Sequence, residues 1–159
     1  MKKSRNVSVY AAWIAVIAMI IIILGFSSQN GGDSVSASER IVDRIISFLN
    51  LDNFFAKNEV LMENRNYIFR KTMHFTEYFI LAMLAFNALR FASLSKTKSS
   101  ILAMLIACLT AVADELYQMT VPGRNSQILD VFIDTAGALA AVLTCLLVFR
   151  KKMDKRTDV

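Results

Sequence analysis

Four apolar segments follow one another along the chain, and the first is the clearest. Residues 7–26 carry no charge and supply twenty residues, about what a helix needs to cross a hydrocarbon core of roughly 30 Å. Three basic residues precede this segment, as in a secretory signal peptide. However, Phe26-Ser27-Ser28-Gln29 is a poor cleavage site and further apolar segments follow. We therefore predict an uncleaved membrane-spanning helix.

Three more apolar segments predict spans at about 71–90, 99–119 and 129–149. Their uncharged cores are shorter than a full span, which is also compatible with buried helices of a soluble protein. The charges favour the membrane, because acidic residues gather at one end of each segment and basic residues at the other. The predicted fold class is all-α: a four-helix transmembrane bundle in a single domain over residues 1–159.

An amphipathic segment at about 34–62 separates the first two spans. Ser36 and Glu39 have the spacing of a capping box, which starts a helix. The apolar residues that follow share one helical face: Ile41, Val42, Ile45, Ile46, Phe48 and Leu49. We expect an interfacial helix on the extracytoplasmic side, acting either as a packing element or as a gate over a cleft.

Composition and charge fit this topology. The chain is 55% hydrophobic and only 19% charged, and its net charge is +5. A basic excess alone would suit a nucleic-acid partner. With the N-terminus inside, however, the inner segments hold 11 basic and two acidic residues, and the outer segments hold seven basic and 11 acidic residues. By the positive-inside rule both termini are cytoplasmic, the partner is the lipid bilayer, and no nucleic acid is expected.

Polar residues cluster at the outer ends of the last three predicted spans. Ionisable groups at membrane depth are expensive and therefore indicate function. Arg70, His74, Glu77 and Tyr78 follow one helical stripe, with Lys71 beside it. From the other two spans and the turn between them come Asp114, Glu115, Gln118, Arg124, Asp130 and Asp134.

This cluster has three interpretations. In the first, Arg70 and Arg124 form ion pairs that lock the helices, with Glu77, Asp114, Glu115, Asp130 or Asp134 as partners. In the second, the site binds an anionic ligand through Arg70, Lys71 and Arg124, with Tyr78, Gln118, Asp130 and Asp134 around it. Its candidate catalytic acids and bases are then His74, Glu77, Asp114 and Glu115. The weakest interpretation is a metal site of the same four residues, since no metal-binding motif occurs.

Other chemistry finds little support. Gly-x-Ser-x-Gly, Cys–His and glycine-rich phosphate-loop patterns are absent, so no cofactor is expected. Cys108 and Cys145 stand alone in apolar segments and suit helix packing. Two lines of small residues in the fourth span allow close helix contacts, within the bundle in preference to a homo-oligomer: Gly137, Ala141 and Cys145, and Ala136, Ala140 and Thr144.

Several of these motifs together resemble the VanZ-like family of bacterial membrane proteins. They are Phe26-Ser27-Ser28-Gln29, Arg70-Lys71-x-x-His74-Phe75-x-Glu77-Tyr78, Asp114-Glu115-x-x-Gln118, and Gly123-Arg124 followed by Asp130 and Gly137. The resemblance implies a place in the bacterial cytoplasmic membrane and a link to tolerance of glycopeptides such as teicoplanin. One departure is Asp134, where family members often have Asn, which adds a negative charge to the site.

Three functions remain open. The favoured one is a charged outer-leaflet pocket that binds an anionic envelope or lipid-linked ligand and contributes to glycopeptide resistance. The first alternative is a membrane-embedded hydrolase or transferase acting on a phospholipid or lipid-linked substrate. The second alternative is a structural partner of another membrane protein.

Overall fold

The computed structural model describes residues 2–124 and 127–157, and the side chains of residues 7–32, 34–124 and 127–149. The basic residues that the topology prediction counts near the two termini lie largely outside the described side chains. Within the described part the chain is all-helical, as predicted. Its helices are α1 (Lys2–Ser27), α2 (Gly31–Phe48), α3 (Asp52–Ala56), α4 (Glu59–Phe91), α5 (Lys96–Gln118) and α6 (Ile128–Thr157).

Among the described residues, three helices are long and apolar enough to cross a membrane. These segments are Val7–Ser27, Lys96–Gln118 and Ile128–Phe149, and they coincide with three of the four predicted spans. The remaining predicted span, 71–90, lies within α4. This helix is long enough, but the polar side chains of its middle turns, including His74 and Glu77, lower its hydropathy. The three apolar helices identify a membrane protein.

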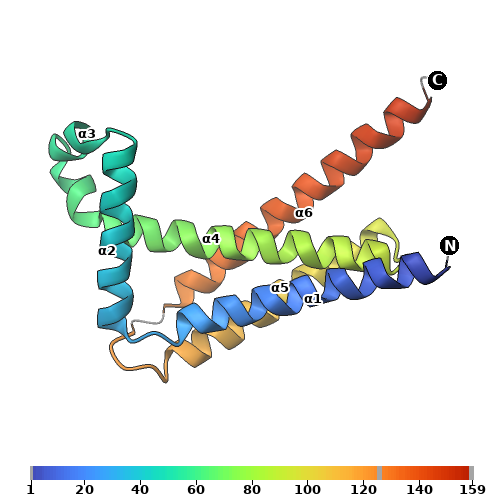
Figure 1. Cartoon of the computed structure of the whole chain (residues 1–159), viewed down its shortest axis with the longest axis horizontal. Coiled ribbons are helices and arrows are strands. Elements are labelled where there is room, and N and C mark those ends of the chain that lie inside the picture. The colour runs from blue at the N-terminus through green and yellow to red at the C-terminus, as the bar shows by residue number, and fades with distance from the viewer. Residues whose placement is uncertain (1, 125–126, 158–159) are drawn as a thin grey trace.

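Helix α4 holds the bundle together, because it contacts every other helix. Figure 1 shows α1, α4 and α5 side by side and α6 crossing α4 obliquely. The shared core is built largely from alanines, whose small side chains let helices approach closely. These fully buried alanines are Ala82, Ala85, Ala88, Ala103, Ala111, Ala138 and Ala141.

Helices α4 and α6 approach each other closely at Gly137. A Cβ at this position would lie 2.2 Å from the carbonyl oxygen of Phe75, so any larger residue pushes the two helices apart. Ala141 and Cys145, on the same line as Gly137, are buried. In contrast, Ala136 and Thr144 on the second predicted line are exposed. Only the first line therefore packs inside the bundle.

Helix α2 runs across one end of the bundle, and the two termini lie at the other end (Figure 1). It begins where Gly31 docks on the loop between α5 and α6. The Gly31 N–H donates to the Pro122 carbonyl oxygen at 3.1 Å, and a Cβ on Gly31 would lie 1.7 Å from the oxygen of Gly123. The predicted capping box at Ser36 is therefore wrong, because Ser36 lies inside a helix that starts five residues earlier.

Helix α2 buries only a narrow face against the rest of the protein. Val42 and Ile46 are buried, whereas the neighbouring Ile45 and Phe48 are exposed. Two polar contacts fasten α2 to the first turns of α4: Arg65 Nε lies 3.2 Å from Asp43 Oδ1, and Asn66 Nδ2 donates to Glu39 Oε1 at 3.0 Å. Since α4 starts at Glu59, the end of the expected interfacial segment is the first turn of this long helix.

Candidate functional site

Polar side chains from four helices converge at the end of the bundle that α2 covers. The buried members of this cluster are Ser27 of α1, His74 of α4, three residues of α5 and two of α6: Asp114, Glu115, Gln118, Asp130 and Asp134. The sequence predicts that the polar ends of the last three spans meet at one depth, and the structure brings them together.

A histidine–carboxylate pair lies between α4 and α6. His74 Nδ1 is 3.4 Å from Asp134 Oδ1, and the Asp134 side chain is 0% exposed. Neither oxygen of Asp134 has a hydrogen-bond partner among the described residues. Gly137 lies one turn beyond Asp134 and lets α6 approach α4 at this level. The buried carboxylate of Asp134 thus faces the His74 imidazole, which offsets its charge only when the ring is protonated.

Lys71 also pairs with α6. Its Nζ forms an ion pair with Asp130 and donates to Gln127 Oε1 at 3.3 Å. Only 16% of the Lys71 side chain and 3% of the Asp130 side chain are exposed. Lys71 is expected from the sequence to hold a ligand, but its charge is neutralised within the protein.

The α5 residues join helices to one another. Gln118 Nε2 donates to Ser27 Oγ at 3.2 Å and to Asp114 Oδ2 at 2.9 Å, and Glu115 Oε2 accepts from the Gln127 N–H at 3.1 Å. Tyr78 is fully buried among apolar side chains. Gln118 and Glu115 thus link α5 to α1 and to the residue before α6, whereas the hydrogen bond of Asp114 to Gln118 lies within α5.

Arg124 caps the end of α1. Its Nε donates to the Gln29 carbonyl oxygen at 3.0 Å, and a second guanidinium nitrogen donates to the Phe26 carbonyl oxygen. The last carbonyls of a helix lack partners within the helix and attract cations. Within the described part of the chain, neither Arg124 nor Arg70 forms an ion pair with a carboxylate. The arginine–carboxylate pairing considered from the sequence therefore does not form.

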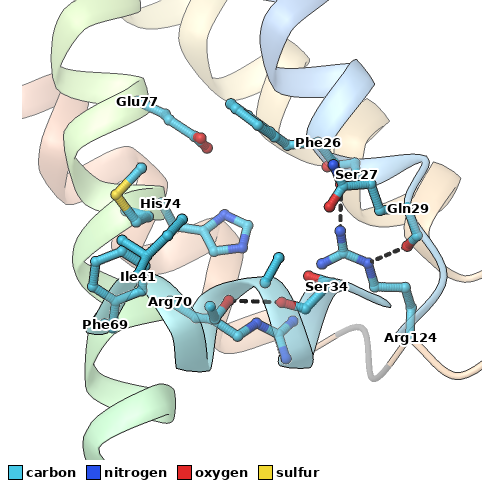
Figure 2. Close-up of a pocket in the computed structure, with 13 residues that line it drawn as sticks. Phe26, Ser27, Gln29, Ser34, Ile41, Phe69, Arg70, His74, Glu77 and Arg124 are labelled. Atoms are coloured by element: carbon cyan, nitrogen blue, oxygen red, sulfur yellow. Dashed lines mark hydrogen bonds between the residues drawn. The ribbon is translucent and has the colours of Figure 1, made fainter. Parts of the chain in front are cut away.

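A pocket of about 180 Å³, here called the large pocket, opens between α1, α2 and α4. Figure 2 shows His74 and Arg124 facing each other across it. Arg70 lines it and has no hydrogen-bond or ion-pair partner among the described residues. Burial and the nearby Arg70 charge lower the pKa of Arg124. The remaining wall is formed mainly by apolar or small polar side chains: Phe26, Ser27, Gln29, Ser34, Ala37, Ser38, Ile41, Phe69, Met73 and Glu77.

A second cavity of about 110 Å³, the small pocket, adjoins the first. Arg70 and His74 line both pockets and so form their common wall. The other side chains of the small pocket are all polar: Tyr67, Lys71, Gln127 and Asp130.

The metal site considered from the sequence is not assembled. No group of three or more His, Cys, Asp or Glu side chains in the described part of the chain is arranged to hold a metal ion. The sequence analysis assigns no role to several residues of the site, among them Ser27, Gln29 and Gln127. The first two belong to the Phe26-Ser27-Ser28-Gln29 motif, which is the signal that marks them, whereas nothing in the sequence singles out Gln127.

Comparison with known proteins gives one finding. A protein-family model described as VanZ/LLP1 matches residues 12–149, which is most of the chain. No curated protein and no solved structure matches the chain.

Proposed function

The chain belongs to the VanZ/LLP1 family, and on that premise we propose that it binds an anionic envelope lipid or lipid-linked molecule in the large pocket. The protein is then a multi-pass component of the bacterial cytoplasmic membrane with both termini in the cytoplasm. By this binding it contributes to tolerance of glycopeptides such as teicoplanin.

Arg70 carries the proposal. Its guanidinium lines the large pocket without a partner among the described residues, while Lys71 beside it is neutralised by Asp130. A cation away from bulk water is costly unless an anion compensates it, and guanidinium matches phosphate and carboxylate with paired hydrogen bonds. Two nitrogens of Arg124 donate hydrogen bonds to carbonyl oxygens at the end of α1. Figure 2 shows the remaining nitrogen directed toward the pocket.

The apolar part of the wall indicates that the ligand is amphipathic. Phe26, Ile41 and Met73 line the large pocket and also remain partly exposed on the outside of the protein. The pocket therefore offers a charged end for a headgroup and an apolar side for a hydrocarbon chain. Such a ligand reaches the site from the lipid, because the pocket lies at the end of the apolar helix α1.

The membrane topology follows from a fourth crossing by the part of α4 that begins near Arg70. Four crossings place both termini on one side, in keeping with their position at the same end of the molecule (Figure 1). The basic inner segments make that side the cytoplasm. The polar cluster and both pockets then lie at the outer leaflet, where a glycopeptide with a lipid tail also resides.

Complementation of a deletion strain tests this function. We expect Arg70→Gln to lower teicoplanin tolerance to that of the deletion strain while its abundance in the membrane stays normal. Arg44→Gln is the matched control, since Arg44 is exposed on α2 and outside both pockets. Full tolerance with Arg70→Gln at normal abundance would refute the proposal.

A further inference from the structure

His74 is placed between two cavities that differ in their lining. The large pocket has several apolar side chains in its wall, whereas every side chain around the small pocket carries a polar group. Arg70 reaches both, so an anionic group held by Arg70 is open to the two cavities at once. A site with a headgroup on one side and room for water on the other is suited to hydrolysis.

The imidazole is also oriented as an acid–base group. Asp134 Oδ1 lies 3.4 Å from His74 Nδ1, so the carboxylate faces this nitrogen and leaves Nε2 for chemistry. The full burial of Asp134, together with the close contact at Gly137, holds the His74–Asp134 pair between α4 and α6. A buried carboxylate that faces an imidazole stabilises the imidazolium that forms when the ring accepts a proton.

Glu77 completes the arrangement on the lipid side. It lies three residues after His74 on α4 and lines the large pocket but not the small one. Of the two groups that would move protons during hydrolysis, His74 therefore reaches both cavities, whereas Glu77 reaches only the large pocket.

We infer that this site hydrolyses a phosphate monoester of a membrane lipid, an inference that rests on the proposed function because it uses the same headgroup site. Arg70 holds the phosphate at the junction of the pockets. Water arrives from the small pocket, and the lipid alcohol departs into the large pocket, which gives the in-line arrangement that displacement at phosphorus requires.

The reaction balances with these groups alone. His74 takes a proton from water as the water oxygen bonds to phosphorus and the ester P–O bond breaks. The departing alcohol oxygen takes the proton of the Glu77 carboxylic acid. The proton on His74 then returns to the Glu77 carboxylate through solvent, so one water is consumed and one lipid alcohol and one inorganic phosphate are released.

The test uses the full-length protein in nanodiscs that contain phosphatidic acid, with release of inorganic phosphate as the measurement. We expect His74→Gln and Glu77→Gln each to lower kcat by about 100-fold or more, the usual contribution of a general acid or base. Glu63→Gln is the matched control, because Glu63 is exposed on α4 and outside both pockets. Glycerol 3-phosphate, which lacks a hydrocarbon chain, should be cleaved far less efficiently.

Asp134 acts through His74 and is a positioning residue. Asp134→Asn should lower kcat at least tenfold with KM unchanged, whereas a structural defect would reduce the amount of active protein and phosphatidic acid binding together. If His74→Gln does not accumulate in the membrane, Glu77→Gln and the comparison of kcat with KM for Asp134→Asn test the hydrolysis inference instead.

Binding of phosphatidic acid, measured in parallel, separates the two proposals. Saturable binding by the wild type without phosphate release overturns hydrolysis and leaves the binding function standing. Absence of phosphatidic acid binding overturns both the hydrolysis inference and the proposed binding function. Wild-type turnover by His74→Gln, or equal cleavage of glycerol 3-phosphate, also overturns the inference.

Discussion

Arg124 and Gln29 join the loop between α5 and α6 to the end of α1, with Arg124 Nε 3.0 Å from the Gln29 carbonyl oxygen. Of the two arginines in the large pocket, one is thus used mainly to close a helix end and the other, Arg70, faces the cavity without a partner among the described residues. Two like residues on one pocket wall therefore have different roles.

Arg124→Ala should destabilise the protein by about 1–2 kcal/mol, because the last carbonyls of α1 lose charge-assisted hydrogen bonds. Thermal unfolding in detergent measures the change. Arg124→Lys should recover part of the loss, since an ammonium keeps the favourable charge but bonds the two carbonyls less well. An unchanged unfolding midpoint for Arg124→Ala would contradict the capping role.

Gly137→Ala should cost about 1–3 kcal/mol, because the added Cβ would lie 2.2 Å from the Phe75 carbonyl oxygen and must separate α4 from α6. Teicoplanin tolerance should fall as well, since the same displacement moves Asp134 away from His74. Gly25→Ala is the matched control, as a Cβ there meets nothing within 4 Å. Equal behaviour of the two variants would show that the helices do not approach so closely.

Lys71 and Asp130 should be strongly coupled in a double-mutant cycle. Removing the lysine leaves a carboxylate that is only 3% exposed without its ion-pair partner, which costs about 3–5 kcal/mol for a buried pair. We expect the double variant to lose less unfolding free energy than the sum of the losses in Lys71→Met and Asp130→Asn. Additive losses in the unfolding free energy would mean that the pair does not form.

Labelling of single cysteines tests the topology. In a chain whose Cys108 and Cys145 are replaced by Ala, Asn53→Cys in α3 should react with a membrane-impermeant maleimide in intact cells. Thr97→Cys at the start of α5 should react only after the cells are permeabilised. Both positions are exposed in the structure, so accessibility within the fold does not limit the reaction. The reverse labelling pattern would invert the proposed orientation.

The helices and the meeting of the polar groups could be predicted because both follow from local patterns. The spacing of Arg70, His74 and Glu77 places them on one stripe, and the predicted order of the spans brings that stripe toward Asp134, which faces His74 in the structure. Hydropathy is a sum over neighbouring residues, so three predicted spans coincide with apolar helices. The polar side chains of α4 lower its mean hydropathy, so α4 is not among these apolar helices.

The hydrogen-bond partners of the arginines and the first residue of α2 could not be predicted, because tertiary contacts determine both. Two arginines and five acids allow many pairings, yet Arg124 bonds backbone carbonyls, which have no signal in a side-chain pattern. Helix α2 starts at Gly31 because its backbone docks on Gly123, a contact between residues 92 positions apart. The capping-box spacing at Ser36 is local and cannot compete with that contact.

Lipid retention by the purified protein tests the central claim most directly. Native mass spectrometry would compare phosphatidic acid and phosphatidylcholine bound to the wild type, Arg70→Gln and Arg44→Gln. Loss of a charge-assisted hydrogen-bond pair predicts that Arg70→Gln binds phosphatidic acid about tenfold or more weakly, with Arg44→Gln equal to the wild type. Equal retention of phosphatidic acid by Arg70→Gln and the wild type would contradict an anion site at Arg70.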